Sequence, residues 1–175
     1  LGEANNPDWK TLVIDETTDA LTVPVGSIGF RWGQEKDGAA TADKGKWNLK
    51  EETSDGRQIK PRLSLVQKHD AVIEAAFPYF GNIAHEHFNS TSHSDVLKRR
   101  VPVRKIQTAN GEMLVATVYD LYVANYGVDQ GLGGDNVASS YDDDIPYTPA
   151  WQEKITGVPR DQVTQVARTC AFCAN

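Results

Sequence analysis

The sequence is poor in sulfur. Its 175 residues include one methionine, Met113, and two cysteines, Cys170 and Cys173. A structural zinc site needs four ligands, and no second cysteine pair is present to complete one. A redox Cys-x-x-Cys motif normally begins a helix, whereas this one ends a predicted helix. We therefore interpret both cysteines as small packing residues of that helix, and two free thiols favour a reducing compartment.

Basic residues and long apolar runs are also scarce. The chain has 18 Lys and Arg against 24 Asp and Glu, a net charge of −6. Nucleic-acid binding requires a basic face, and the short run at residues 98–100 is better explained as a solvated strand edge. No apolar run approaches the roughly 18 residues of a membrane helix, and no leader pattern is visible. The sequence thus predicts no nucleic-acid partner and no membrane span.

The two ends of the sequence look like cuts. The chain begins at Leu1, and the last predicted helix runs almost to Asn175 without a glycine stop. We expect an internal fragment of a longer protein. Strongly periodic apolar segments are confined to about 101–172, so we predict a loop-rich segment with short strands at 1–100 and a hairpin with helices at 101–175. An irregular stretch as long as the first part needs a larger neighbour, so we expect the isolated chain to be only partly ordered.

Alternation and turn residues predict a β-hairpin at about 101–118. The residues from Val101 to Gln107 alternate apolar and polar side chains, and residues 113–118 return with a second apolar run. Between them, Asn110 and Gly111 are expected to supply the two positive-φ positions of a tight turn. Short strands are also expected at 9–14 and 21–23.

Three capped helices are predicted at about 119–126, 149–156 and 159–172. Thr148 and Pro149 have the residue types preferred at the N-cap and at the first helical position, and Gly157 is a typical stop. Pro159 starts the next helix in the same way. This helix carries an apolar stripe for a core at i, i+3, i+4 and i+7, formed by Val163, Val166, Ala167 and Cys170. Mixed strands and helices give the fold class α/β, or α+β within this piece.

A series of short motifs resembles one family in the same order. They are Asn-Asn-Pro-Asp-Trp-Lys-Thr at 5–11, Gly-Ser-Ile-Gly-Phe-Arg-Trp-Gly at 26–33, Lys-Gly-Lys-Trp-Asn-Leu at 44–49, Phe-Pro-Tyr-Phe-Gly at 77–81, Glu-His-Phe-Asn at 86–89, Thr-Val-Tyr-Asp-Leu at 117–121, Ala-Asn-Tyr-Gly at 124–127, Ser-Tyr-Asp-Asp at 140–143, and Tyr-Thr-Pro-Ala-Trp at 147–151. From about residue 2 to about 168, the sequence resembles the alpha subunit of membrane-bound respiratory nitrate reductases, in the molybdopterin oxidoreductase family.

The resemblance implies a large parent subunit that reduces nitrate to nitrite. Its cofactors would be a molybdenum bis-molybdopterin guanine dinucleotide and a [4Fe-4S] cluster. Electrons would come from quinol through a haem-bearing membrane gamma subunit and an iron–sulfur beta subunit, and the parent would be membrane-associated through these partners, on the cytoplasmic face. The relatives of this enzyme that oxidise nitrite share a similar subunit, and the sequence does not separate the two.

The resemblance transfers no catalytic or metal-binding residue to this sequence. In the family, the cluster ligands and the molybdenum-ligating Asp lie upstream of the matching stretch. The sequence therefore predicts no catalytic residue and no metal ligand, and it leaves the cofactor-binding residues unknown. Arg31 with Trp32, and Asn125 with Tyr126, are the matching residues that could approach the cofactor or the substrate funnel.

Two alternative functions stay open. A small zinc hydrolase could use His85, His87 and His93, because hydrolytic zinc needs three ligands and an open position. The surrounding sequence, however, offers no rigid scaffold for three ligands. The other alternative is a non-catalytic interaction module with exposed aromatic residues, namely Trp32, Trp47 and Tyr141.

Two further segments resemble ligand loops but lack essential residues. The glycine-rich stretch 127–135 has no Lys-Ser/Thr pair and follows no predicted strand, so we interpret it as a surface loop. Residues 142–144 are three consecutive Asp, without the alternating ligands and the glycine of a calcium loop. They are predicted to form a solvated turn.

Overall fold

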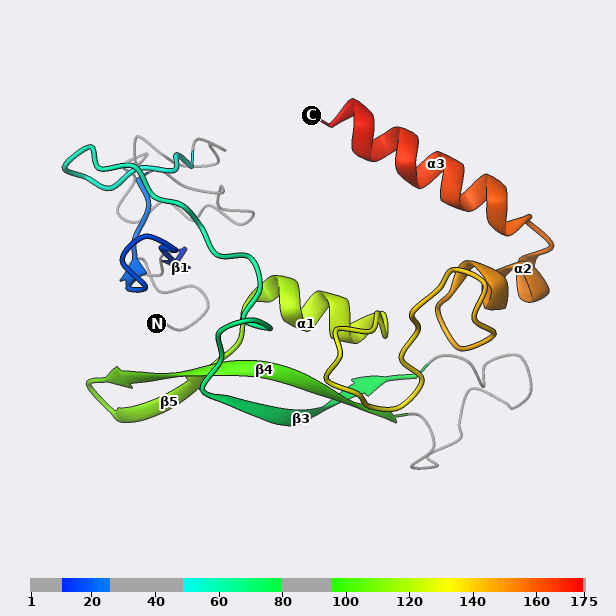
Figure 1. The fold of residues 1–175 in the computed structure, drawn as a ribbon, viewed down its shortest axis with the longest axis horizontal. Coiled ribbons are helices and arrows are strands. Elements are labelled where there is room, and N and C mark those ends of the chain that lie inside the picture. The colour runs from blue at the N-terminus through cyan, green and yellow to red at the C-terminus, as the bar shows by residue number, and fades with distance from the viewer. Residues whose placement is uncertain (1–10, 26–48, 80–95, 175) are drawn as a thin grey trace, which may run out of the picture. The chain divides into compact units, whose positions relative to one another are not determined.

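The computed structural model describes residues 11–25, 49–79 and 96–174. It divides into two compact units, Leu1–Arg62 and Leu63–Asn175. The first contains strands β1 (Val13–Ile14) and β2 (Leu21–Thr22). The second contains every other strand and helix of the described residues (Figure 1). The predicted mixed α+β class is confirmed, while the predicted division between residues 100 and 101 stays a prediction about the domains of a longer protein.

The first unit is organised around a buried carboxylate. Strands β1 and β2 pair in antiparallel fashion, and Asp15 follows β1 directly. Although Asp15 is fully buried, its oxygens accept hydrogen bonds from the amides of Thr17 (3.1 Å) and Lys60 (3.2 Å) and pair with Arg57. Burial of a charge is tolerated because these donors replace the water that the carboxylate has lost.

The second unit is built on a three-stranded antiparallel sheet of order β3-β4-β5. The strands are β3 (Ala71–Pro78), β4 (Val96–Thr108) and β5 (Gly111–Val115). Strand β3 pairs with the first part of β4, from Ala71 opposite Val103 to Pro78 opposite Val96. Strand β5 pairs with the second part, from Arg104 to Thr108. The sequence did not predict β3, because this alanine-rich segment has only a weak apolar alternation. Its eight residues are ordered by pairing with β4.

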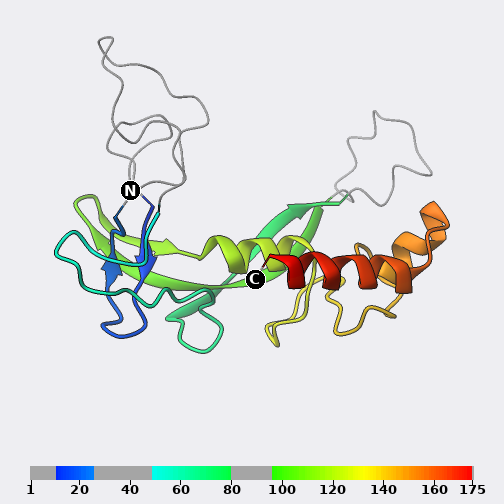
Figure 2. The ribbon, with the colours of Figure 1, turned by 90° about the horizontal axis from the view of Figure 1, so that it is seen from above.

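The core of this unit lies between the sheet and helix α1 (Val118–Asn125). Successive side chains of a strand point to opposite faces, and Leu97, Val101 and Val103 are the buried apolar residues of one face of β4. Helix α1 packs on β4, as both ribbon views show (Figures 1 and 2). Lys98 and Arg100 alternate with the buried residues and are exposed.

The hairpin forms where it was predicted, but its turn is shifted by one residue. Thr108 pairs with Gly111, so Ala109 and Asn110 occupy the turn, and Gly111 already belongs to β5. Gly111 has φ +103°, whereas Asn110 is not in the positive-φ region. The expectation that both Asn110 and Gly111 are positive-φ turn residues is therefore wrong. The reason is local: the Thr108 hydroxyl donates to the Gly111 carbonyl (2.8 Å) and accepts from the Asn110 amide (3.2 Å).

The helices begin and end close to their predicted bounds. They are α1, α2 (Pro149–Thr156) and α3 (Arg160–Cys173). For α1, Thr117 is the N-cap, and its hydroxyl accepts from the Asp120 amide (2.9 Å), so the helix begins one residue early. Pro159 is the N-cap of α3 rather than its first residue. In the part of the chain that the structure describes, no helix combines the length and the apolar character of a membrane span.

The apolar stripe of α3 does not enter a core formed by the described residues. None of its residues is buried, and Val166 is 62% exposed. The principal element contact of α3 is with α2, and Val163, near the start of α3, is half-buried. Cys170 and Cys173 are also exposed and free, so their predicted packing role finds no partner among the described residues.

Candidate functional site: the Arg99 clamp and the helix junction

Arg99 is the central polar residue of the second unit. It lies on the buried face of β4 with only 1% of its surface exposed. Its Nη1 donates to the carbonyls of Ala124 (2.9 Å) and Asn125 (2.8 Å), at the carboxyl end of α1. Its Nε and Nη2 donate to the carbonyls of Asp135 (3.0 Å) and Asn136 (3.2 Å). Four of its five N–H groups are thus used on backbone oxygens.

The position of Arg99 suits its charge. The last carbonyls of a helix carry partial negative charge and lack intrahelical partners. A guanidinium at the end of α1 compensates this charge and donates hydrogen bonds to these carbonyls. The Tyr147 ring adds a cation–π contact, with its centroid 5.8 Å from the Arg99 guanidinium carbon. Burial lowers the pKa of Arg99 from its ordinary value. With its donors occupied, Arg99 is a structural cation and offers little to a bound anion.

The glycine-rich loop is held by Arg99 and by the free edge of β4. The Asp135 amide donates to the Lys98 carbonyl (2.8 Å), and the Lys98 amide donates to the Asp135 carboxylate (2.9 Å). Gly134 fits this edge because a Cβ at this position would lie 2.7 Å from the Arg99 Cα. At Gly127 a Cβ would lie 2.6 Å from the Arg99 Nη2. We define the Arg99 clamp as Arg99 with the segment 124–136 that it binds.

The clamp explains why the loop 127–135 is no phosphate cradle. A cradle directs amide N–H groups at the ligand, whereas here backbone carbonyls converge on a cation. The loop was predicted to lie on the surface. It does carry exposed residues, but its ends are fixed to β4 and α1.

Tyr147 joins three elements in an aromatic cluster. Its ring makes edge contacts with Tyr79 (6.4 Å between centroids), Tyr126 (6.3 Å) and Trp151 (5.6 Å). Its hydroxyl donates to the Pro78 carbonyl (3.0 Å) at the end of β3. The backbone of Tyr147 has φ +73°, which is uncommon for a bulky residue and is maintained here by these surroundings. The sequence placed Tyr147 in the family motif at 147–151 but predicted none of these contacts.

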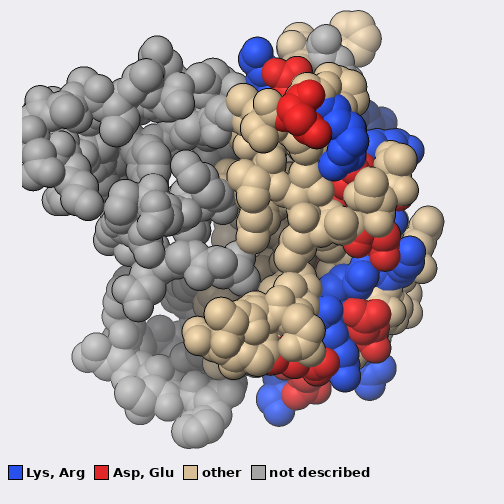
Figure 3. Space-filling model, turned by 90° about the vertical axis from the view of Figure 1, so that its left-hand side faces the viewer, with Lys and Arg blue, Asp and Glu red and all other residues tan. Residues whose placement is uncertain are grey.

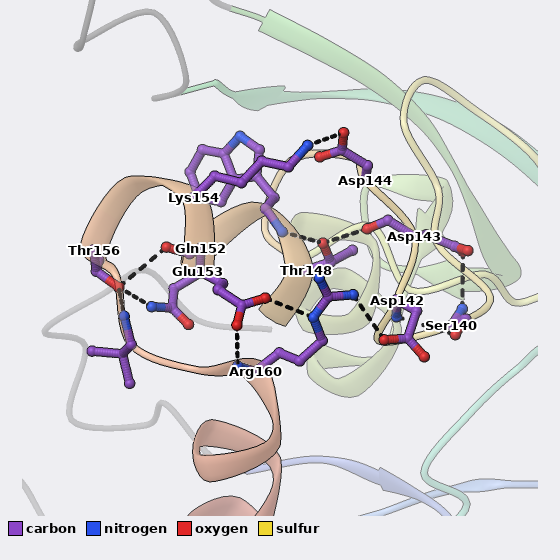
Figure 4. Close-up of polar contacts among 12 residues, drawn as sticks. Ser140, Asp142, Asp143, Asp144, Thr148, Gln152, Glu153, Lys154, Thr156 and Arg160 are labelled. Atoms are coloured by element: carbon purple, nitrogen blue, oxygen red, sulfur yellow. Dashed lines mark hydrogen bonds and ion pairs between the residues drawn. The ribbon is translucent and has the colours of Figure 1, made fainter.

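The junction of α2 and α3 is a second polar network (Figure 4). Thr148 caps α2, because its hydroxyl accepts from the Trp151 amide (3.1 Å) and donates to the Asp143 carbonyl (2.6 Å). Arg160, the first residue of α3, donates from Nε to Glu153 (2.7 Å) and from Nη1 to Asp142 (2.9 Å). The Arg160 guanidinium lowers the pKa of Glu153, and the two carboxylates raise the pKa of Arg160.

These contacts account for the three consecutive Asp residues. Asp142 pairs with Arg160, and Asp144 pairs with Lys154. Asp143 accepts from the amides of Ser139 (2.8 Å) and Ser140 (2.9 Å). The carboxylates point to three different partners and do not converge, which agrees with the predicted turn and not with a calcium loop.

The residues named as candidate sites are distributed unevenly over the structure. His85, His87, His93, Arg31, Trp32 and Trp47 lie outside the described residues. Asn125 and Tyr126 belong to the Arg99 clamp, and Tyr141 is an exposed residue near α3. Among the residues that the structure describes, no three His, Cys, Asp or Glu side chains form a metal-binding group. The described residues therefore do not supply the ligand set of an iron–sulfur cluster.

Charged side chains of both signs are mixed on the described face that Figure 3 shows. Figure 3 shows Lys and Arg side chains beside Asp and Glu side chains over the visible described face. Ion pairs among the described residues include Lys98 with Glu74 (3.2 Å).

Comparison with known proteins extends the match to the whole chain. The respiratory nitrate reductase 2 alpha chain of Escherichia coli (strain K12) is 48% identical over 176 residues, covering 100% of this chain and 13% of the relative. The nitrate reductase alpha chain of Bacillus subtilis (strain 168) is 38% identical over 173 residues, covering 97% and 12%. The nitrate reductase alpha subunit of Mycobacterium tuberculosis (strain CDC 1551 / Oshkosh) is 37% identical over 175 residues, covering 97% and 12%. No protein-family model matches the chain.

The chain spans 12–13% of the length of these relatives. The resemblance predicted from the short motifs is confirmed by identity that extends along the entire sequence. The chain belongs to the family of respiratory nitrate reductase alpha chains, of which it matches one segment.

Proposed function

We propose that this chain is a structural segment of the catalytic alpha subunit of a respiratory nitrate reductase. The observation that carries the proposal is the 48% identity along the full chain to one such alpha chain. The Arg99 clamp and the capped helix junction support a structural role, because their polar groups are occupied by one another. In this role the segment holds loops and helices in position, while the chemistry takes place elsewhere in the subunit.

The whole enzyme, in this proposal, reduces nitrate to nitrite. A molybdenum bis-molybdopterin guanine dinucleotide held elsewhere in the subunit would supply oxygen-atom transfer. Electrons from quinol would arrive through a haem-bearing gamma subunit, an iron–sulfur beta subunit and a [4Fe-4S] cluster. The enzyme would be membrane-associated through these partners, on the cytoplasmic face. Residues 101–175 would be part of the molybdopterin oxidoreductase domain, and residues 1–100 part of a larger domain.

A segment exchange tests the proposal. The matching segment of the nitrate reductase 2 alpha chain of Escherichia coli is replaced by this chain, and the chimera is produced with its partner subunits in a strain without nitrate reductase. We expect membranes to reduce nitrate at a rate within about tenfold of the parent, a difference of about 1.4 kcal/mol in activation free energy. The measurement is nitrite formation with a quinol analogue as electron donor.

A matched control uses the same chimera with Arg99→Met. Because this change removes the donor of four backbone hydrogen bonds, we expect loss of the assembled enzyme. The proposal is wrong if the unmodified chimera accumulates and assembles as the parent does but forms no nitrite.

A further inference from the structure

Helix α3 turns its polar face towards its own unit. An open groove lies between this helix and the loop that contains Tyr141 and Asp142. The α3 residues that line the groove include Asp161, Gln165 and Arg168, at i, i+4 and i+7. Residues with this spacing share one face of a helix, so the side of α3 next to the loop is polar.

The apolar stripe of α3 therefore lies on the other side of the helix. At 100° per residue, Val166, Ala167 and Cys170 centre on the side of the helix opposite the centre of Asp161, Gln165 and Arg168, with Cys170 furthest round. All three are exposed, and no residue of this 14-residue helix is buried. An amphipathic helix of a folded domain normally directs its apolar stripe to the core. Here the polar side meets the neighbouring loop, and the part of the stripe beyond the half-buried Val163 is exposed.

We infer that this stripe is a docking face for an aliphatic surface of the remainder of the alpha chain. The inference rests on the proposed function, which makes this chain one segment of a longer subunit. The relatives are long enough to supply the occupant, because the matched segment is only 13% of their length. The stripe carries no charge and consists of small apolar side chains, so a closely packed apolar helix or sheet face is the complementary partner.

Cys170 is a natural reporter for this docking, because alkylation of a thiol requires exposure. The experiment uses a Cys173→Ser background and measures alkylation of Cys170 by N-ethylmaleimide with peptide mass spectrometry. It compares the 175-residue chain with the full-length chimeric alpha subunit. In the full-length subunit we expect Cys170 to react at least about tenfold more slowly, because reaction then requires local opening. A Gln165→Cys variant in a Cys170→Ser, Cys173→Ser background is the matched control on the polar face. Its alkylation rate should differ less between the 175-residue chain and the full-length subunit.

Val166→Asp provides a second measurement. In the full-length chimera this change should lower the amount of trypsin-resistant alpha subunit about tenfold, because a carboxylate cannot enter an apolar contact unpaired. Gln165→Asp adds the same charge at the neighbouring position, where Arg168 follows three residues later, and should be tolerated. In the 175-residue chain the two variants should behave alike, since both positions are exposed.

The outcomes separate the inference from the proposed function. If the unmodified chimera forms nitrite but Cys170 reacts as fast as in the 175-residue chain, the docking face is wrong and the proposed function stands. If the unmodified chimera assembles without nitrite formation, the proposed function is wrong and the inference falls with it. If light scattering shows that the 175-residue chain is a dimer that Val166→Asp dissociates, the occupant is a second copy, which also overturns the inference.

Discussion

At the scale of single residues, Arg99 is the side chain on which most of the second unit depends. Its guanidinium connects β4, the end of α1 and the glycine-rich loop through hydrogen bonds to four carbonyls. Nothing in the sequence around Arg99 distinguishes it from Lys98 and Arg100, which are exposed. The alternation of a strand shows that Arg99 points to the face opposite these two, but only the packing of α1 on β4 decides which face is buried.

Arg99→Met should loosen the clamp. The change removes the guanidinium donor from four carbonyls, three of them in part-buried contacts, at a cost of about 3 kcal/mol, equivalent to about 100-fold faster local exchange. Hydrogen exchange of the Asp135 amide, which donates to the Lys98 carbonyl, measures the effect in the 175-residue chain. Arg99→Lys keeps the charge but cannot reach all four carbonyls, so its effect should be intermediate. Unchanged protection in Arg99→Met would contradict a structural role for this residue.

The glycines of the loop are expected to differ in their tolerance of alanine. Gly131 has φ +75°, and no atom lies within 4 Å of the position that a Cβ would occupy. Gly131→Ala should therefore cost about 1 kcal/mol from backbone strain alone. Gly134 has φ +132°, and its Cβ would meet the Arg99 backbone. Gly134→Ala should lower the free energy of local unfolding at least twice as much. Hydrogen exchange of the Asp135 amide measures both changes. Equal effects of the two changes would show that the loop does not follow β4 closely.

Asp15 should make the first unit sensitive to acid. Its pKa is lowered well below the ordinary 3.8, first by the hydrogen bond from Arg57 and further by the amides of Thr17 and Lys60. A lowered pKa means that the folded state prefers the ionised form, so the stabilisation is complete above pH 3.8 and is lost as the pH falls below it. Hydrogen exchange of the Lys60 amide between pH 5 and pH 2 should show this loss. Asp15→Asn should remove most of the pH dependence.

At the scale of elements, the helices followed from local chemistry. Thr148, Pro149 and Gly157 predicted the bounds of α2 correctly, because an N-cap hydroxyl and a left-handed C-cap act within one turn. The position of the hairpin was predicted correctly, but its turn residues were not. The sequence pair Asn110-Gly111 favours one register, whereas Thr108 and the pairing along β4 select another. Strand β3 depends on its partner and could not be recognised from its own residues.

Thr148→Ala tests the cap of α2. The Trp151 amide would lose its acceptor, and the expected cost is about 1 kcal/mol, or about fivefold faster exchange of that amide. Thr148→Ser retains the hydroxyl and should keep most of the protection. If the Trp151 amide exchanges at the same rate in Thr148→Ala and Thr148→Ser, its contact with the hydroxyl does not stabilise the helix.

At the scale of the whole molecule, we predict that the 175-residue chain is only partly ordered in isolation. Helix α3 has no buried residue, and α1 exposes Tyr119, Tyr122 and Val118. Such a chain should show a broad thermal transition with a low calorimetric enthalpy, because cooperative unfolding needs a shared core. A sharp two-state transition in differential scanning calorimetry would contradict this expectation.

The same preparation should bind no stoichiometric molybdenum, iron or zinc and should form no nitrite. Elemental analysis and a nitrite assay measure these properties directly. One tightly bound equivalent of zinc that is lost in His85→Ala would instead support the hydrolase alternative.

The sequence by itself determined the mixed α+β class, the capped helices, the place of the hairpin and the family. These features depend on residues near one another in the chain or on the order of short motifs. Only the tertiary structure decided that Arg99 is buried, that Gly134 lies against its backbone, that Tyr147 joins three elements and that the apolar stripe of α3 is exposed beyond Val163. Each of these depends on contacts between residues distant in sequence, and local preferences carry no information about such pairings.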